Sequence, residues 1–120
     1  MSMNSKVVAP TLRRFPRLVV DGPLSVRVLA LDSVMDVQDI SLGGANTLSP
    51  LPLEPGARHT FEFRLRGAGA MHLKACIVYC RADQGAFSIG WAWETDAVTE
   101  ENARALLDYL TDVRNMGHDA

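Results

Sequence analysis

The stretch Asp39-Ile40-Ser41-Leu42-Gly43-Gly44 has residue types and a spacing that suit a polar, planar ligand. In an extended strand, side chains two positions apart point to the same face, so Asp39 and Ser41 would present a carboxylate and a hydroxyl together. The paired glycines that follow lack a Cβ and leave the backbone accessible. An ordinary tight turn between two strands is the alternative, and it is favoured when the stretch is taken alone.

A second group that could do chemistry lies upstream, where Arg13, Arg14 and Arg17 place three of the twelve basic residues within five positions. Pro16 argues against a helix here, because the residue before a proline avoids the α region. The planar guanidinium fork matches two phosphate oxygens or the O6/N7 edge of guanine. The cluster would therefore lie on an extended or turning segment where it could bind an anionic ligand, and a solvated basic patch is the alternative.

Composition limits the function classes. The chain has 120 residues, a net charge of −2 and 48% hydrophobic residues, which predicts one soluble globular domain with its own core. The charge gives no support for general DNA, RNA or membrane-surface binding. No apolar run reaches the roughly 20 residues of a membrane helix, and residues 1–10 lack the apolar core of a secretory signal. We therefore expect a cytoplasmic protein without membrane insertion.

The titratable residues form no recognisable catalytic or metal-binding set. Cys76 and Cys80 fall in one predicted strand and would lie about 13 Å apart at ~3.3 Å per residue, too far for a disulfide, which needs Cα atoms within roughly 7 Å. The three histidines lie on unrelated predicted elements. Ser41 has no histidine near it in the sequence. We expect no metal site, no cofactor and no enzymatic activity.

Alternating apolar residues predict about six short strands at roughly ten-residue spacing. The expected strands cover residues 24–31, 34–40, 45–48, 59–66, 71–79 and 87–93. Residues 1–10 show no periodic pattern and are expected to form a tail. The strand pattern predicts a mainly β fold, a small antiparallel barrel or closed sheet.

The final segment changes to a helical period. Its apolar stripe consists of Ala103, Leu106, Leu107, Leu110 and Val113, spaced as in an amphipathic helix. Thr99 is the expected N-cap, and Gly117 the expected C-terminal stop. The helix should pack at one end of the β structure.

Taken together, the two motifs resemble those of PilZ domains. Arg13-Arg14-Phe15-Pro16-Arg17 is similar to the arginine motif of that family, two arginines with three residues between them. Asp39-Ile40-Ser41-Leu42-Gly43-Gly44 is similar to its second motif, Asp or Asn, any residue, Ser, any two residues, Gly. The resemblance implies a six-stranded antiparallel split β-barrel with a C-terminal α-helix. It divides the chain into a tail at 1–10, a PilZ domain at 11–117 and a short tail at 118–120.

Many PilZ domains are receptors for the bacterial second messenger cyclic di-GMP, so the resemblance implies that ligand and a set of binding residues. That set comprises Arg13, Arg14, Arg17, Asp39, Ser41, Gly43 and Gly44. Asp39 would accept hydrogen bonds from guanine N1–H and the exocyclic amine, and the arginines would bind the phosphodiesters. Tyr79 is a further candidate that could stack on a guanine, with a plain core aromatic as the alternative.

The resemblance also implies how such a domain would signal. Residues 11–17 would fold over the ligand and expose a new surface to a downstream partner protein. Leu12 stands where some family members have an additional arginine and hold two intercalated ligand molecules, which favours a single ligand here. The alternative is a nucleotide-independent PilZ-like module that acts through protein contacts, for example in pilus or motility regulation. The presence of both motifs counts against that alternative.

Overall fold

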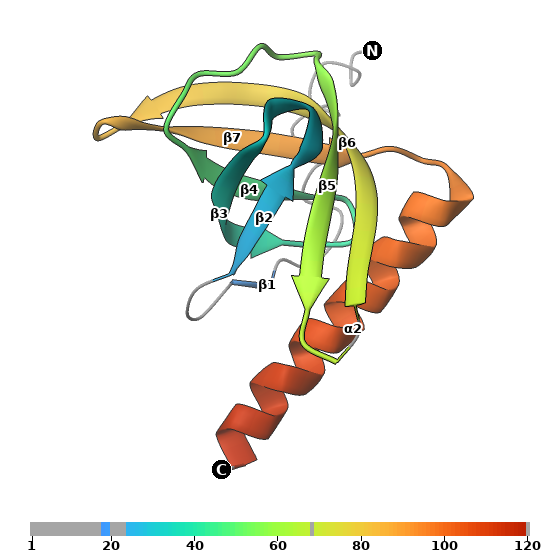
Figure 1. Cartoon of the computed structure of the whole chain (residues 1–120). Helices are drawn as coiled ribbons and strands as arrows, with labels where there is room; N and C mark the ends of the chain where they lie inside the picture. Colours follow the sequence, from blue (N-terminus) through green and yellow to red (C-terminus); the bar gives the residue numbers. More distant parts are fainter. Residues whose placement is uncertain (1–17, 20–23, 68, 120) are drawn as a thin grey trace, which may run out of the picture.

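The computed structural model describes residues 18–19, 24–67 and 69–119 (Figure 1). Within these residues, seven strands and two helices follow one another. They are β1 (Leu18–Val19), β2 (Ser25–Val28), the 3-10 helix η1 (Leu29–Leu31), β3 (Ser33–Ile40), β4 (Gly44–Ser49), β5 (Arg58–Leu65), β6 (Gly69–Asp83), β7 (Ala86–Trp93) and the α-helix α2 (Ala97–Asp119).

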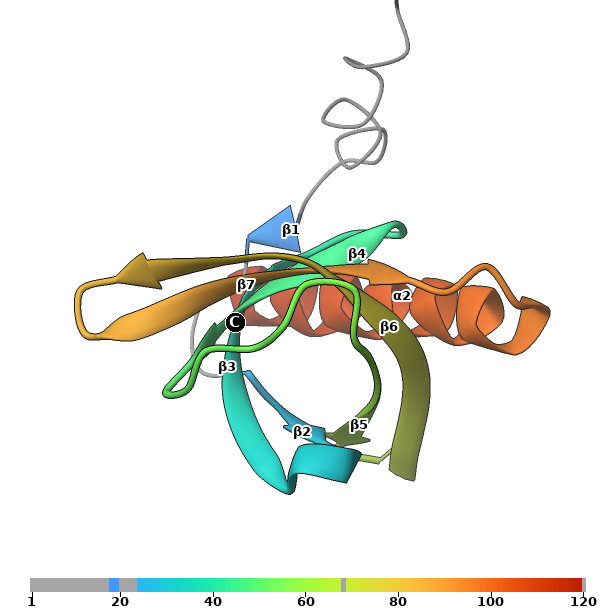
Figure 2. The same ribbon diagram turned by 90° about the horizontal axis from the view of Figure 1, so that it is seen from above.

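The strands close into a barrel. Their order is β1-β3-β2-β5-β6-β7-β4, and β4 pairs back onto β3. Every pairing is antiparallel. Strands β2 to β7 therefore form a closed six-stranded antiparallel barrel, which is visible as a ring of strands in Figure 2, and the fold predicted from the sequence is confirmed. Strand β1 adds to the edge of β3 that also carries β2.

The barrel interior is filled by the inward residues of the alternating strands. The largest fully buried side chains are Trp91, Phe61, Phe63, Met35, Ile40, Leu73, Ile77, Ile89, Leu106, Val26 and Val28, together with Thr47. The ring of Phe61 packs edge-on against Trp91 and Trp93, with centroids 4.6 and 5.4 Å apart. Each such side chain contributes roughly 1.5–3 kcal/mol through burial, so this aromatic cluster anchors the fold.

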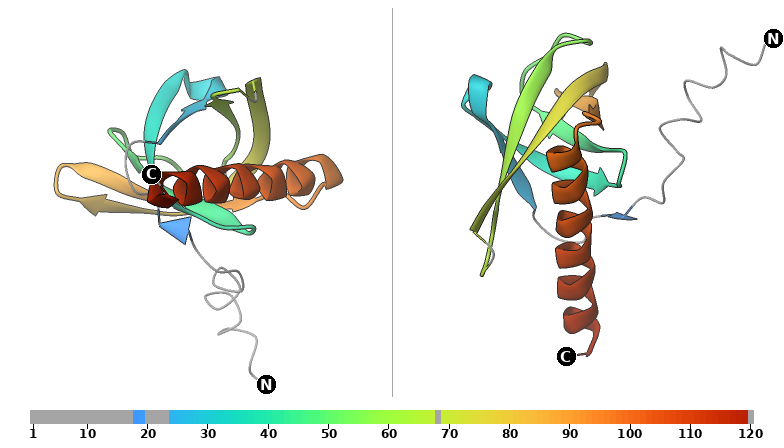
Figure 3. Two further views of the ribbon diagram at one scale, coloured as in Figure 1. Left: turned by 90° about the horizontal axis from the view of Figure 1, so that it is seen from below. Right: turned by 90° about the vertical axis from the view of Figure 1, so that its right-hand side faces the viewer.

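Helix α2 runs along one side of the barrel, and its C-terminal turns extend past the strand ends (Figure 3). Its residues Ala103 and Leu106 are buried against the barrel. The first part of β6 pairs only with β5, and α2 covers the edge that this leaves. Asn102 Nδ2 donates to the carbonyl oxygen of His72 at 2.8 Å, and Thr99 Oγ1 accepts a long 3.5 Å bond from the Lys74 N–H.

Two predicted boundaries of α2 are wrong. The N-cap is Asp96, whose Oδ1 accepts from the Thr99 N–H at 2.8 Å and whose Oδ2 accepts from the Thr99 hydroxyl at 2.9 Å. Thr99 lies inside the first turn and is buried, at 2% exposure. The helix continues past Gly117 to Asp119, so Gly117 does not end it.

The first predicted strand, 24–31, is also too long. It ends at Val28, and Leu29–Leu31 form η1 with Leu29 40% and Leu31 38% exposed. Val28 is already opposite Ser33 of β3, so the chain must reverse between them despite its continuing apolar pattern. Asp32 completes the reversal with a φ of 49°.

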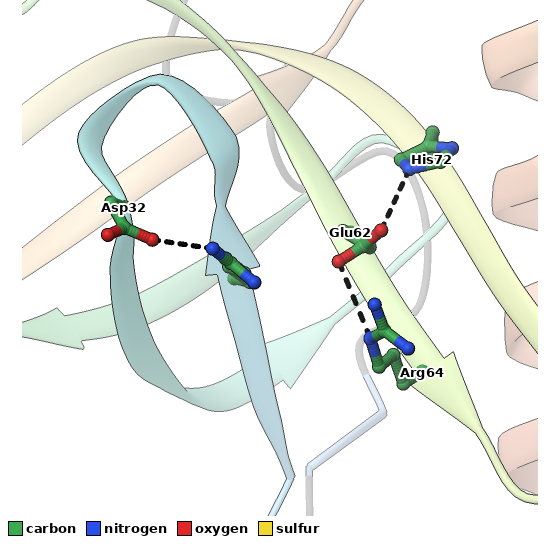
Figure 4. Close-up of polar contacts among 5 residues, drawn as sticks. Asp32, Glu62, Arg64 and His72 are labelled. Carbon is green, nitrogen blue, oxygen red and sulfur yellow. Dashed lines mark hydrogen bonds and ion pairs between the residues drawn. The ribbon is translucent and has the colours of Figure 1, made fainter.

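Polar contacts between charged side chains lie on the outer face of the barrel (Figure 4). Arg27 pairs with Asp32 across the β2–β3 connection at 2.6 Å. Glu62 contacts His72 at 3.2 Å and Arg64 at 3.5 Å. Exposed pairs of this kind contribute about 0–1 kcal/mol each, so the barrel does not depend on them.

Candidate ligand-binding site

A small hollow lies where β3, β4, β6 and β7 meet. It is lined by Asp39, Ser41, Gly43, Gly44, Ala45, Asn46, Tyr79, Gly90 and Trp91. The structure thus brings together five residues that the sequence predicts for a site: Asp39, Ser41, Gly43, Gly44 and Tyr79. The cavity volume is ≈ 20 Å³, enough for about one water molecule. A nucleotide base would lie over this hollow rather than inside it.

A β-bulge turns Asp39 toward the hollow. Val37 lies opposite Thr47, but Asp39 lies opposite Asn46, so Gln38 is an extra residue in β3. Val37 and Ile40 are both buried, at 4% and 1% exposure, although strict alternation would put them on opposite faces. The bulge shifts the phase of the strand by one residue. As a result, Asp39 projects away from the core.

The turn after β3 is held by its own polar groups. The Ser41 N–H donates to the Gly44 carbonyl at 2.8 Å, and Ser41 Oγ accepts from the Gly43 N–H at 3.1 Å. Ser41 is only 4% exposed. Its side chain therefore shapes the turn first, while the hydroxyl proton is still able to donate to an acceptor above the hollow.

Close packing of β4 against β7 requires a glycine at position 44, and the sequence did not indicate this contact. It pairs with Ala92 of β7, and a Cβ added to Gly44 would lie 1.9 Å from the carbonyl oxygen of Trp91. No side chain fits in that space. Gly44 thus sets how closely β4 approaches β7 at the hollow, in addition to lining it.

Tyr79 lies within β6, not near a strand end as the sequence suggested, because β6 continues to Asp83. It is opposite Gly90, and a Cβ on Gly90 would meet the tyrosine ring 2.1 Å from Cε2. The guanidinium of Arg81 lies 4.6 Å from the ring centroid, a cation–π arrangement. The Tyr79 hydroxyl donates to Asn46 Oδ1 at 3.3 Å, so the ring is fixed at the rim of the hollow.

Sequence reasoning missed two polar residues here, Asn46 and Arg81. Arg81 follows Tyr79 by two positions, and the period of an extended strand would have placed both on one face. Asn46 comes opposite Asp39 only because of the bulge at Gln38. The sequence holds no glycine or other signal that marks that bulge.

The predicted basic residues Arg13, Arg14 and Arg17 lie outside the described residues. The chain that follows them directly is β1, in which Leu18 pairs with Ile40 and Val19 with Asp39. The second residue of this strand, Val19, thus lies opposite Asp39.

Neither a metal cluster nor a membrane-spanning helix is found in the part of the chain that the structure describes. No three His, Cys, Asp or Glu side chains of those residues gather as they would around a metal ion. None of the described helices is both long enough and apolar enough to cross a membrane. The hollow beside Asp39 is the candidate site because five of the residues predicted from the sequence line it.

Solved structures share this fold. The chain is similar to YcgR from Escherichia coli in complex with c-di-GMP, with a TM-score of 0.68 and 20% identity over 89% of this chain and 49% of that one. The PilZ domain of YcgR from Escherichia coli with c-di-GMP has a TM-score of 0.64 and 19% identity over 90% of this chain and 98% of that one. The inhibitor of motility MotI/DgrA from Bacillus subtilis has a TM-score of 0.65 and 18% identity over 90% of this chain and 52% of that one.

These structural relatives differ from the chain in length and are distant in sequence. The chain spans about half the length of full YcgR and of MotI/DgrA. No curated protein matches its sequence. The family model for the PilZ domain, however, matches residues 11–112, a range that contains both the arginine cluster and the Asp39–Gly44 stretch. The chain therefore belongs to the PilZ domain family.

Proposed function

We propose that this domain is a non-enzymatic, cytoplasmic receptor for cyclic di-GMP. The observation that carries the proposal is the hollow, which gathers Asp39, Ser41, Gly44 and Tyr79 beside the strand that directly follows the arginine cluster. Two structural relatives, YcgR and MrkH, are described in complex with c-di-GMP. Family membership and site composition support the same ligand.

The chemistry of the ligand fits the residues. Cyclic di-GMP carries two phosphodiester charges and two guanines. Asp39 offers a carboxylate to the N1–H and amine of one guanine, and Tyr79 offers a ring at the rim of the hollow. Arg13, Arg14 and Arg17 supply guanidinium groups for phosphate oxygens or for the O6/N7 edge of guanine. Each charge-assisted hydrogen bond contributes about 1.5–3 kcal/mol.

Calorimetric titration with cyclic di-GMP tests the proposal directly. The intact chain should bind one ligand molecule, and Arg13→Ala or Arg17→Ala should weaken binding at least about tenfold. Arg104→Ala is the matched control, because Arg104 is exposed on α2 and does not line the hollow. Absence of both heat and a melting-temperature shift at high ligand concentration would contradict the proposal and favour a nucleotide-independent interaction module.

The signal would pass to a partner protein by closure of residues 11–17 over the bound ligand. Such closure creates a surface that exists only in the ligand-bound state. Hydrogen exchange with and without cyclic di-GMP tests this step. Slower exchange in residues 11–17 on binding is the expected result, and unchanged exchange there despite binding would contradict closure while leaving the receptor function intact.

A further inference from the structure

Asn46 occupies a position in the site that neither motif includes. It lies on β4, directly opposite Asp39 across the β3–β4 pairing, and it lines the hollow. Directly opposed residues of antiparallel strands have Cβ atoms about 4.5–5.5 Å apart. Asp39 and Asn46 therefore form a side-by-side pair of polar groups at the mouth of the hollow.

Two hydroxyl groups fix the side-chain amide of Asn46. Its Oδ1 accepts from the Tyr79 hydroxyl at 3.3 Å and from Ser88 Oγ at 3.1 Å. In this orientation the Nδ2 amide nitrogen carries two N–H donors, and neither N–H donates to another of the described residues. The fixed amide thus presents donors beside the acceptor of Asp39.

We propose that Asn46 reads guanine by donating from Nδ2 to O6, while Asp39 accepts from N1–H and the exocyclic amine. This inference rests on the proposed function. The Watson–Crick edge of guanine presents O6, N1–H and the amine in a row, one acceptor followed by two donors. The Asn46–Asp39 pair presents the complement in the same order, one donor beside an acceptor. Ser88 acts as a positioning residue, because it contacts Asn46.

The pair also discriminates against adenine. Adenine has an amine where guanine has O6, and an unprotonated N1 where guanine has N1–H. Against adenine, Asn46 would set a donor against a donor and Asp39 an acceptor against an acceptor. Such mismatched polar groups are left without partners in the site. The proposal therefore predicts selectivity for cyclic di-GMP over cyclic di-AMP that depends on Asn46.

The test measures the ratio of the two dissociation constants, for cyclic di-GMP and for cyclic di-AMP, by calorimetry on the intact chain. Asn46→Asp keeps the acceptor for Tyr79 and Ser88 but replaces the Nδ2 donors with a second acceptor. Because both ligands carry the same charge, the ratio cancels the general effect of the added carboxylate. We expect the ratio to fall at least about tenfold. Gln38→Glu, an exposed change outside the hollow, adds the same charge and should leave the ratio unchanged.

Two further variants keep the test decisive. Asn46→Ala removes the donors without adding charge, and it replaces Asn46→Asp if that variant does not fold; its ratio should fall about fivefold. Ser88→Ala frees one side of the amide and should lower the ratio less, with the melting temperature nearly unchanged. A wild-type ratio retained in both Asn46 variants would overturn the inference. Failure of the wild-type chain to bind cyclic di-GMP would instead overturn the proposed function.

Discussion

The indole Nε1–H of Trp93 donates a 2.9 Å hydrogen bond to the main-chain carbonyl of Ser41, and both residues are buried. The Trp93 backbone N–H also donates to the carbonyl of Gly43 at 2.9 Å. The last residue of β7 therefore holds the turn after β3 at two points. Through these bonds the core of the barrel fixes the turn that carries the candidate site.

Trp93→Phe should consequently affect both stability and ligand binding. Phenylalanine keeps an aromatic ring but leaves the buried Ser41 carbonyl without its donor, which costs about 1–3 kcal/mol of unfolding free energy. The loosened turn should also weaken cyclic di-GMP binding. Urea denaturation measures the first effect, and calorimetric titration measures the second.

Thr47→Val is the matched control for this change. It removes the other buried tryptophan bond of β7, from Trp91 Nε1 to Thr47 Oγ1 at 2.9 Å, without touching the turn. It should destabilise the chain by a similar amount and leave the affinity for cyclic di-GMP near its wild-type value. Equal losses of affinity in the Trp93 and Thr47 variants would show that the Trp93–Ser41 bond has no particular role in the site.

Gly44→Ala should be among the most damaging small substitutions. The added Cβ would meet the backbone of Trp91 at 1.9 Å, and backbone cannot rotate away, so we expect a loss of about 3 kcal/mol or more. Gly67→Ala provides the comparison. Gly67 has a φ of +79° and open space around it, so only the left-handed conformation is penalised, at about 1–2 kcal/mol. Equal losses by urea denaturation would contradict the close β4–β7 contact.

Asp39 lines the hollow and lies opposite Asn46, so its substitution tests the proposed site directly. Asp39→Ala should weaken cyclic di-GMP binding at least about tenfold, the equivalent of one charge-assisted hydrogen bond. Asp36→Ala is the control, because Asp36 is exposed on the same strand and lies outside the hollow. Both variants lose one carboxylate, so a difference between their titrations isolates the position of the group. Equal affinities would remove Asp39 from the site.

The barrel and the residues that fill it could be predicted because burial leaves a period of two in the sequence. The alternation of Phe61, Phe63 and Leu65 predicted β5, and all three are buried. Asp39 and Ser41, two positions apart, likewise line one hollow. The burial of Phe61, Phe63 and Leu65 depends on local pattern alone, whereas the bulge at Gln38 also contributes to the direction of Asp39.

The features that the sequence could not reveal depend on contacts between distant segments. Asn46 reaches the site because Gln38 is an extra residue in the β3–β4 ladder, and a bulge formed by such a residue leaves no compositional signal. Asp96 and Thr99 are both good capping residues. Thr99 does not cap α2, because it lies in the first turn, where its N–H and its hydroxyl both donate to the carboxylate of Asp96.

The bond from Asn102 to His72 should stabilise the junction of α2 with β6. Asn102→Ala leaves the carbonyl of His72 without this donor and should lower the unfolding free energy by about 1 kcal/mol. Glu62→Gln weakens the exposed contacts with Arg64 and His72 on the same face and should cost less than about 1 kcal/mol. Denaturation curves of the two variants test whether the helix contact outweighs the surface charges. A larger loss in Glu62→Gln would reverse that order.

The cap of α2 predicts how stability changes with acid. The backbone N–H of Thr99, and then its hydroxyl, hold the pKa of Asp96 below its ordinary value of 3.8. A carboxylate whose pKa is lowered on folding stabilises the folded state above the unfolded pKa, and that contribution is lost as pH falls through the folded pKa. Asp96→Asn keeps a capping oxygen but does not titrate. Melting temperatures measured below about pH 4 should therefore fall more steeply in the wild type than in Asp96→Asn, and parallel curves would contradict the cap.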